Sequence, residues 1–297
     1  MNNWAVPKRY FKLTLFAGRE PDKEKEVNVL SKLGIESKIN FDTSASVSGS
    51  LNEANIQITG LDRPTMLYLA TCYNQYNRIL NHVTIDAGYE NNHGVIFDGN
   101  IVSAIPNLNN ENYSISLKAV AGFENLLDGN PIISKQGKVA VSDILYEIAI
   151  NNGLVLRNTA KPVYIDGYVD NGEGVAEKIR KLSDMTGLNI YIDGKTLNCN
   201  PHDMGKERSD FIINYKNMVG SPRPTPIGAE VTIRMNPSLT TGSPVRLTSL
   251  KFPQLGDNSY FVQTVSHKGD TKGNDWVTNV YLIRQGYEQY ANEPTIV

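Results

Sequence analysis

Two stretches of this chain, one in its first half and one near its end, carry the same pattern of strands. Ile101–Val120 aligns with Thr264–Ile283 without a gap, at a constant offset of 163 residues. The matched residues are Val102 with Val265, Ser103 with Ser266, and Tyr113 with Trp276. Because a slip of one residue would turn every side chain to the other face of a sheet, the shared alternation predicts one hairpin used twice. Coincidence is the alternative, since any two antiparallel hairpins alternate in this way.

The residues around the first copy read mostly as strands. Asn55–Gly60 alternates apolar and polar side chains, as a half-buried strand does. Asp62-Arg63-Pro64 predicts the start of a helix over about 62–78, because a capping acid and a proline in the first turn favour a helix N-terminus. Asp98-Gly99 is typical of a hairpin turn. Residues 1–125 are therefore expected to form a first tube-like β-barrel with one helix.

Helical periodicity replaces strand alternation in the middle of the chain. Apolar side chains recur at helical spacing along Val141–Ala149 and again along Val175–Met185, and Asp193-Gly194 then joins two short strands. After Pro201 the pattern returns to strands. The sequence predicts a mainly β fold with an α+β insertion, in which two related tube-like antiparallel β-barrel domains flank a small α/β domain. The expected domains are 1–125, 126–202 and 203–297, the last with a C-terminal tail.

Charge and cysteine content exclude several classes of partner. The formal net charge is −2 and the pI about 6.1, so the electrostatics do not favour nucleic acid as a main partner. Cys72 and Cys199 lie far apart without metal-ligand or disulfide spacing, and two reduced thiols are expected.

No apolar run reaches the ~18 residues of a membrane helix, and Tyr10–Phe16 has the pattern of a strand rather than of a signal sequence. We expect no membrane partner and synthesis in a cytoplasm-like compartment.

Catalytic and metal-binding motifs are missing from the sequence. The histidines lack a second ligand at the spacing that zinc sites use; they are His82, His93, His202 and His267. No nucleophile elbow, phosphate loop or dinucleotide fingerprint occurs. The carboxylate pairs Glu111 with Glu124 and Asp166 with Asp170 are candidates for glycoside cleavage, but no lysozyme-like helix frames them. We therefore expect no enzyme, no cofactor and no metal site.

Several motifs resemble those of the phage late control protein D and baseplate hub family. In that family a strand ending in V-x-H leads through a Gly/Asp loop to a strand that opens W-x-T, as Val265–His267 and Trp276–Thr278 do here. Met235–Leu247 is similar to the family's P-x-L-x-x-G-x-x-V-x-L turn between strands. The other similar segments are Phe41-Asp42, Ala54–Ile58 and Ala176–Leu197. The resemblance covers most of the chain, and the order and spacing of the motifs carry it.

The resemblance implies an assembly protein of a phage tail. Such hubs are homotrimers whose subunits each carry two tube-like barrels, so that three subunits present six similar units to a sixfold tail tube and a threefold side to the spike. The implied partners are further copies of the chain, the tail tube protein, the central spike protein and other baseplate proteins. DNA would pass through the channel without sequence recognition. The implied location is the tail baseplate of the virion, assembled in the host cytoplasm.

Two groups of residues are candidates for contacts between subunits. Tyr287 and Tyr290 are aromatic, and aromatic side chains are enriched at interfaces. Pro222, Pro224 and Pro226 form a loop whose alternating prolines remove hydrogen-bond donors. A solvated loop is the alternative for this second group.

Three other functions stay open at the level of sequence. The first is a hub or spike of a related injection device, such as a type VI secretion system or a tailocin. The second is a cell-wall hydrolase carried by the tail, which peptidoglycan lysis would reveal. The third is a carbohydrate-binding β-sandwich for host attachment, which would bind glycans and would not match a trimer to a hexamer.

Overall fold

The computed structural model describes residues 7–17, 25–28, 38–47, 52–72, 81–108, 113–121, 131–193, 196–201, 211–256 and 259–285. Strands dominate, and most of them belong to one 13-stranded sheet. The α-helices among these residues are α2 (Arg63–Cys72), α4 (Val141–Asn151) and α5 (Val175–Thr186). The prediction of a mainly β fold with an α+β insertion is confirmed.

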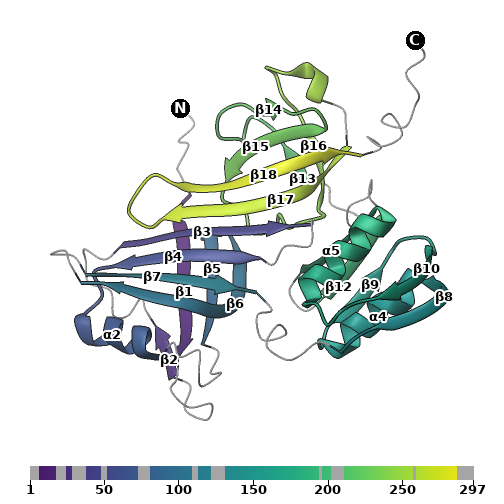
Figure 1. Ribbon diagram of the computed structural model, residues 1–297. Coiled ribbons are helices and arrows are strands. Elements are labelled where there is room, and N and C mark those ends of the chain that lie inside the picture. Colours follow the sequence, from purple (N-terminus) through teal and green to yellow (C-terminus); the bar gives the residue numbers. More distant parts are fainter. Residues whose placement is uncertain are drawn as a thin grey trace.

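The first half of the sheet lies below the second in Figure 1 and contains the strands drawn in purple and blue. Its strands are β1 (Arg9–Ala17), β2 (Lys25–Asn28), β3 (Lys38–Ser46), β4 (Glu53–Thr59), β5 (His82–Tyr89), β6 (Asn92–Asn107) and β7 (Ser114–Val120). They are ordered β3-β4-β7-β6-β5-β1-β2. Helix α2 contacts β6 and β7. This half encloses an apolar core, to which Met235 and Trp276 of the second half also contribute.

Local sequence explains these elements. Along β4, Ala54, Ile56 and Ile58 are buried while the residues between them point outward, as the alternating pattern predicts. Helix α2 begins after Asp62, whose Oδ2 accepts a hydrogen bond from the backbone N–H of Thr65 over 3.0 Å, as an N-cap does. The part of the predicted helix that extends to residue 78 lies beyond Cys72, outside the described residues.

The second half repeats the strand order of the first. Its strands are β13 (Phe211–Ile213), β14 (Arg223–Pro224), β15 (Gly228–Arg234), β16 (Pro244–Leu247), β17 (Ser259–Asp270) and β18 (Trp276–Arg284). The pairings give the order β14-β15-β18-β17-β16-β13, which matches β3-β4-β7-β6-β5-β1 strand for strand. One difference is that β13 runs parallel to β16, whereas β1 runs antiparallel to β5. A separate apolar cluster fills this half.

The two halves are joined edge to edge. Strand β17 pairs antiparallel with β3, from Thr264 opposite Ser46 to Asp270 opposite Asn40. Figure 1 shows β17 and β3 side by side where the yellow and purple strands meet. The barrels expected from the repeat are thus parts of one continuous sheet.

The residues between the halves form a smaller unit, drawn in teal on the right of Figure 1. Its strands are β8 (Ser134–Ala140), β9 (Val155–Asn158), β10 (Tyr164–Val169), β11 (Leu188–Asp193) and β12 (Thr196–Pro201). They form a β8–β10 pair and a β11-β12-β9 sheet, and α4 and α5 pack against these strands around a third apolar cluster. The predicted helices and the predicted pair of strands after them are all present.

One turn prediction is wrong. Asp98-Gly99 lies within β6, and the chain turns instead at Glu90 and Asn91, between β5 and β6. The physical reason for a glycine at this position is close packing. A Cβ on Gly99 would lie 2.7 Å from the backbone oxygen of Val120, where β6 meets the end of β7.

Candidate functional site

The junction between the two halves is organised around Trp276, the first residue of β18. Its indole N–H donates a hydrogen bond to the backbone oxygen of Gly88 in β5 over 2.9 Å. The ring is 3% exposed and meets Phe41 edge-on, with centroids 5.6 Å apart. Phe11 of β1 in turn stacks on Phe41 of β3 at 5.3 Å. Among the described strands β1 and β3 share no ladder, so these aromatic rings fill the space between them.

Gly269 of β17 lies directly under this aromatic cluster. The register places it opposite Phe41 on one side and opposite Trp276 on the other. A Cβ at this position would lie 2.3 Å from Phe41 Cζ and 2.9 Å from Trp276 Cζ3. A side chain here is therefore incompatible with the present packing, and the glycine allows both rings to cover the backbone of β17.

Arg9 of β1 forms hydrogen bonds with the loop between β17 and β18. Its guanidinium donates hydrogen bonds to the backbone oxygens of Gly273 (2.7 Å) and Asp270 (3.2 Å), and it lies over the Trp276 ring at 5.2 Å. The Asp270 carboxylate accepts hydrogen bonds from the backbone N–H groups of Lys272 and Gly273 and contacts Lys38 Nζ at 2.7 Å. Burial raises the pKa of Asp270, but the contacts from Lys38 and the two N–H groups outweigh it and hold that pKa below its usual value.

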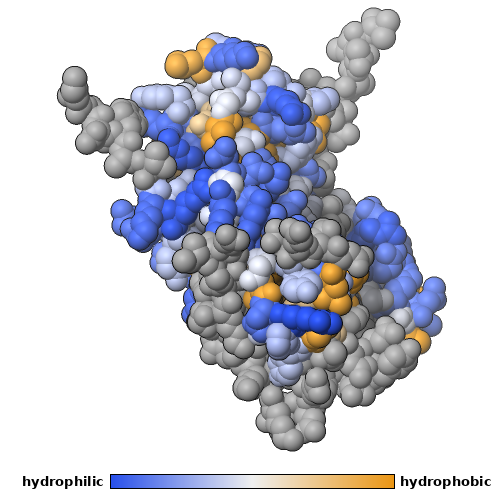
Figure 2. Space-filling model, turned by 90° about the vertical axis from the view of Figure 1, so that its left-hand side faces the viewer, coloured by the Kyte–Doolittle hydropathy of each residue, from blue (hydrophilic) through white to orange (hydrophobic). Residues whose placement is uncertain are grey.

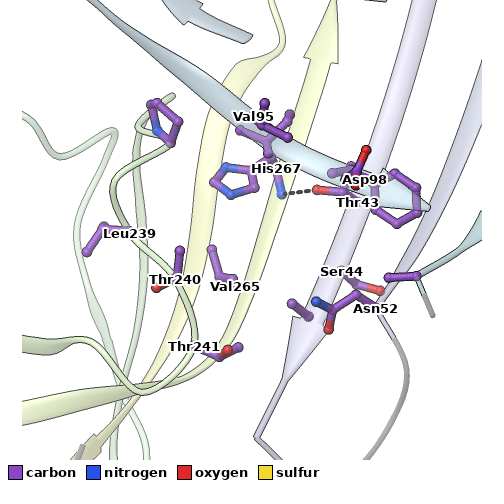
Figure 3. Close-up of a pocket in the computed structure, with 15 residues that line it drawn as sticks. Thr43, Ser44, Asn52, Val95, Asp98, Leu239, Thr240, Thr241, Val265 and His267 are labelled. Atoms are coloured by element: carbon purple, nitrogen blue, oxygen red, sulfur yellow. Dashed lines mark hydrogen bonds between the residues drawn. The ribbon is translucent and has the colours of Figure 1, made fainter. Parts of the chain in front are cut away.

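A cavity of about 230 Å³ lies where the halves meet. Figure 3 shows it between β3, β6, β17 and the loop that carries Leu239, Thr240 and Thr241. His267 lines it and is 4% exposed. Its backbone N–H points to Thr43 Oγ1 (3.4 Å), and its Nδ1 lies 2.9 Å from Thr278 Oγ1. Burial lowers the pKa of His267 to about 4, so the ring is neutral at pH 7 and serves as a hydrogen-bonding group within the sheet.

The sheet presents a polar face opposite its core. Across the strands the polar groups are paired: Lys118 Nζ with Glu53 (3.0 Å), Ser266 Oγ with Asp42 (3.2 Å), Thr232 with Asn279 (2.8 Å) and Lys268 with Asp275 (2.9 Å). Each of these carboxylates has a cation or hydroxyl partner, so the face is polar and close to charge balance. Figure 2 views the molecule from the side on which the β17–β18 loop projects, and the middle of that surface is mostly hydrophilic.

The observed strand registers change which residues of the two hairpins correspond. Ser103 pairs with Lys118 after a bulge at Val102, and Thr264 pairs with Tyr281 after a bulge at Gln263. Lys118 aligns with Tyr281 at the offset of 163, so the register matches Ser103 with Thr264 instead of Ser266. The second hairpin carries two more residues in its connection. Because two is an even number, the alternation of faces is unchanged and the sequence alignment concealed the gap.

Tyr113 and Trp276 keep their match under the amended register. The backbone N–H of Gly60, just after β4, bonds to the oxygen of Tyr113 over 2.9 Å. The N–H of Met235, just after β15, bonds to the oxygen of Trp276 over 3.2 Å. Both rings also pack against the first core. Tyr113, just before β7, and Trp276, the first residue of β18, therefore accept corresponding backbone hydrogen bonds from the neighbouring strand.

The other candidate residues are scattered. Pro222 is buried and Pro224 and Pro226 are exposed, in and beside β14. His82 Nε2 lies 3.3 Å from Asp98, and the His93 ring stacks on Tyr10 at 3.7 Å. Tyr287, Tyr290, His202, Glu111 and Glu124 lie outside the described residues.

Asp166 and Asp170 do not form an exposed pair. Asp166 lies in β10, next to a bulge, while Asp170 is buried and contacts Lys178 Nζ at 3.0 Å. No group of three or more His, Cys, Asp or Glu residues in the described ranges could hold a metal ion. None of the helices in those ranges is both long and apolar enough to span a membrane.

Sequence reasoning missed Arg9, Gly88 and Gly269. Each acts through a partner more than 180 residues away or on a neighbouring strand, which no local motif reveals. The one usable signal was the glycine in the run His267-Lys268-Gly269, because glycine within a strand marks a close approach.

This fold occurs in proteins of phage tails and of a secretion system. The 43 kDa tail protein of prophage MuSo2 from Shewanella oneidensis is 12% identical, with a TM-score of 0.58, over 92% of this chain and 98% of that one. A type VI secretion system component of E. coli, c3393, which exhibits structural similarity to T4 tail proteins gp27 and gp5, is 11% identical with a TM-score of 0.61 over 89% and 78%. A tail protein from Neisseria meningitidis MC58 is 11% identical with a TM-score of 0.57 over 93% and 97%.

The sequence places the chain more specifically. The model of the baseplate hub gp41 family matches residues 22–281. The chain belongs to this family of baseplate hubs. None of the curated proteins matches it in sequence.

Proposed function

We propose that the chain is the structural hub of a phage tail, a homotrimer that matches a sixfold tail tube to a threefold central spike. The observation that carries this proposal is the repeated strand order, β3-β4-β7-β6-β5 in one half and β14-β15-β18-β17-β16 in the other. Three chains with two such halves supply six similar units around one axis. The corresponding domains are 1–125 and 203–297, with 126–202 inserted between them.

The polar sheet face is the part we assign to the central passage. Two lysines of this face, Lys118 and Lys268, are each paired with a carboxylate, and unpaired protein cations are what hold DNA phosphates. A passage with such a wall would let DNA move through without holding it. We assign no catalysis and no cofactor to the chain, and we place it in the tail baseplate of the virion after assembly in the host cytoplasm.

Native mass spectrometry of the purified chain, alone and mixed with its tail tube and spike proteins, tests the proposal. We expect a trimer, and images of the complex should show a threefold ring with six similar lobes. A strictly monomeric mass across a wide concentration range, with and without those partners, would contradict it. Lysis of peptidoglycan by the purified chain would contradict the non-enzymatic part alone.

A hub of a secretion device is the second candidate. The similar fold of the E. coli type VI secretion component favours it. The genes next to this one would distinguish the two candidates. In both cases the chain acts as an assembly protein.

A further inference from the structure

The cavity at the junction of the two halves has a buried inner wall and an exposed rim. The side chains of the inner wall are at most 5% exposed; they are Thr43, Phe97, Leu239, Thr241, Val265 and His267. The rim includes Val95, which is 57% exposed, and the exposed residues Ser44 and Asp98. The volume of about 230 Å³ exceeds that of an engineered protein cavity of about 150 Å³ that binds benzene. The cavity therefore has room for one six-membered ring with a small substituent.

The hydrogen bonds of Thr278 determine which nitrogen of the neutral His267 ring carries the proton. Thr278 Oγ1 accepts a hydrogen bond from the backbone N–H of Asn236 over 2.9 Å and lies 2.9 Å from His267 Nδ1. Thr278 is fully buried, and within the described residues Nδ1 is the acceptor for its hydroxyl proton. Nδ1 therefore accepts, and the ring proton lies on Nε2.

The Nε2–H group of His267 faces the cavity. In the sheet His267 lies between Thr278 of β18 and Thr43 of β3. Because Nδ1 is directed at Thr278, the other edge of the ring, with Nε2, is directed away from β18. Figure 3 shows the ring extending from β17 toward the loop that carries Leu239 and Thr240. No residue in the described ranges accepts a hydrogen bond from Nε2, so the inner wall presents a buried donor to whatever enters the cavity.

The other lining residues restrict the chemistry of a ligand. The apolar part of the inner wall is formed by Phe97, Leu239 and Val265. An anionic ligand is disfavoured, because the described lining contains the Asp98 carboxylate and neither lysine nor arginine. A matching ligand is neutral, with a flat apolar body and an oxygen that accepts from Nε2–H. A hydroxyl oxygen also brings a proton, for which the Thr43 and Thr241 hydroxyls line the same wall. A phenol combines these features.

We propose that the cavity binds a phenolic ring, whose hydroxyl oxygen accepts a hydrogen bond from His267 Nε2 while the opposite end of the ring points to the rim at Val95 and Asp98. The ring belongs to a free phenol or to a tyrosine that another protein inserts through the rim, since both present the same hydroxyl and the same apolar surface. This site is separate from the hub function, which rests on the repeated strand order. Failure of the site would leave that function unaffected.

Calorimetric titration of the purified chain with phenol and with toluene tests the ligand class. Toluene has the shape of phenol but cannot accept the hydrogen bond. The ratio of phenol affinity to toluene affinity should fall about tenfold in His267→Leu, because desolvation of the two ligands is the same for both proteins and cancels. His267→Gln keeps an N–H donor and should retain part of the ratio. An unchanged ratio in His267→Leu, or no binding of phenol to the parent chain, would overturn the proposal.

A surface pair of variants tests the position of the site without altering the core. Val95→Trp places a large side chain over the rim and should weaken phenol binding more than about tenfold. The matched control is Val169→Trp, because Val169 is a strand residue of similar exposure (55%) in the inserted unit. This control should bind phenol like the parent. The pair keeps the test decisive if His267→Leu does not fold, and equal phenol affinity of both variants would overturn the proposed site.

Two further measurements identify the source of the ring and the donor. A capped tripeptide with a central tyrosine should compete with p-cresol if the ring comes from another protein, whereas binding of p-cresol without the peptide would identify a free phenol. Nitrogen NMR of the chain labelled with ¹⁵N-histidine reports the tautomer of His267 among the four histidines. The proton should be on Nε2, and the Nε2 resonance should shift when phenol is added. A proton on Nδ1 would contradict the assigned donor.

Discussion

The indole N–H of Trp276 reaches the backbone oxygen of Gly88 across 2.9 Å, although the two residues are 188 positions apart in the chain. Trp276 begins β18 in the second half of the sheet, while Gly88 lies near the end of β5 in the first. A side chain of one half thus completes the core of the other. The two halves are therefore expected to unfold together.

The first prediction concerns this hydrogen bond. Trp276→Phe removes the donor of the hydrogen bond to the Gly88 oxygen and opens space beside Phe41. We expect a loss of about 2 kcal/mol in the free energy of unfolding, measured by denaturant titration. Tyr113→Phe, at the matching place in the first hairpin, is the control and should cost less. A Trp276→Phe variant as stable as the parent would show that the bond does not couple the halves.

The second prediction concerns the glycine under the aromatic cluster. Gly269→Ala forces a Cβ against Phe41 and should destabilise the protein by about 1–3 kcal/mol through overpacking. Gly94→Ala is the control, because a Cβ there would meet Pro237 at an ordinary 3.4 Å. Phe41→Leu combined with Gly269→Ala should recover part of the loss in thermal unfolding. If the double variant loses the sum of both single effects, the clash is not the cause.

The third prediction is a pH dependence caused by His267. Its pKa of about 4 in the folded protein lies below the usual 6.5, so the unfolded chain binds the proton more readily between these values. Stability should fall as the pH drops from about 6.5 to 4, by about 3 kcal/mol from this residue. His267→Gln should flatten that part of the profile, while His82→Gln controls for the loss of a partly exposed histidine. An unchanged slope in His267→Gln would contradict the assignment.

The fourth prediction concerns the inserted unit. The side chains of Lys178 and Asp170 are 2% and 0% exposed, and Lys178 Nζ also donates to Pro131 O over 2.7 Å. Lys178→Met leaves the Asp170 carboxylate buried without its cation and should cost about 3–5 kcal/mol. Lys181→Met, on the same helix but 34% exposed, should cost less than about 1 kcal/mol.

Hydrogen exchange should localise the Lys178→Met effect to α5 and β10, because this unit has its own apolar cluster. Equal loss of protection in β17 would mean instead that the inserted unit and the large sheet unfold as one.

The sequence predicted those features that depend on neighbours along the chain. Ala54, Ile56 and Ile58 recur every second residue and form a half-buried strand, and the apolar spacing of Val141–Ala149 forms a helix. Periodicity reports which face of an element is buried, and nearby residues alone determine it. The same local signal misled at Asp98-Gly99, where glycine serves close packing between strands and not a turn.

The relation between strands came from the tertiary structure. A shift of two residues leaves the alternation of apolar and polar positions unchanged. The two-residue gap in the repeat, which matches Ser103 with Thr264, therefore appeared only in the hydrogen-bond registers. The β17–β3 joint and the contact of Trp276 with Gly88 likewise depend on which edges meet after folding. Apart from the N–H that each proline lacks, strand edges offer the same backbone groups, and packing over the whole sheet determines which edges meet. The repeated hairpin could therefore be predicted from the sequence. Its place in a single continuous sheet depends on long-range contacts alone.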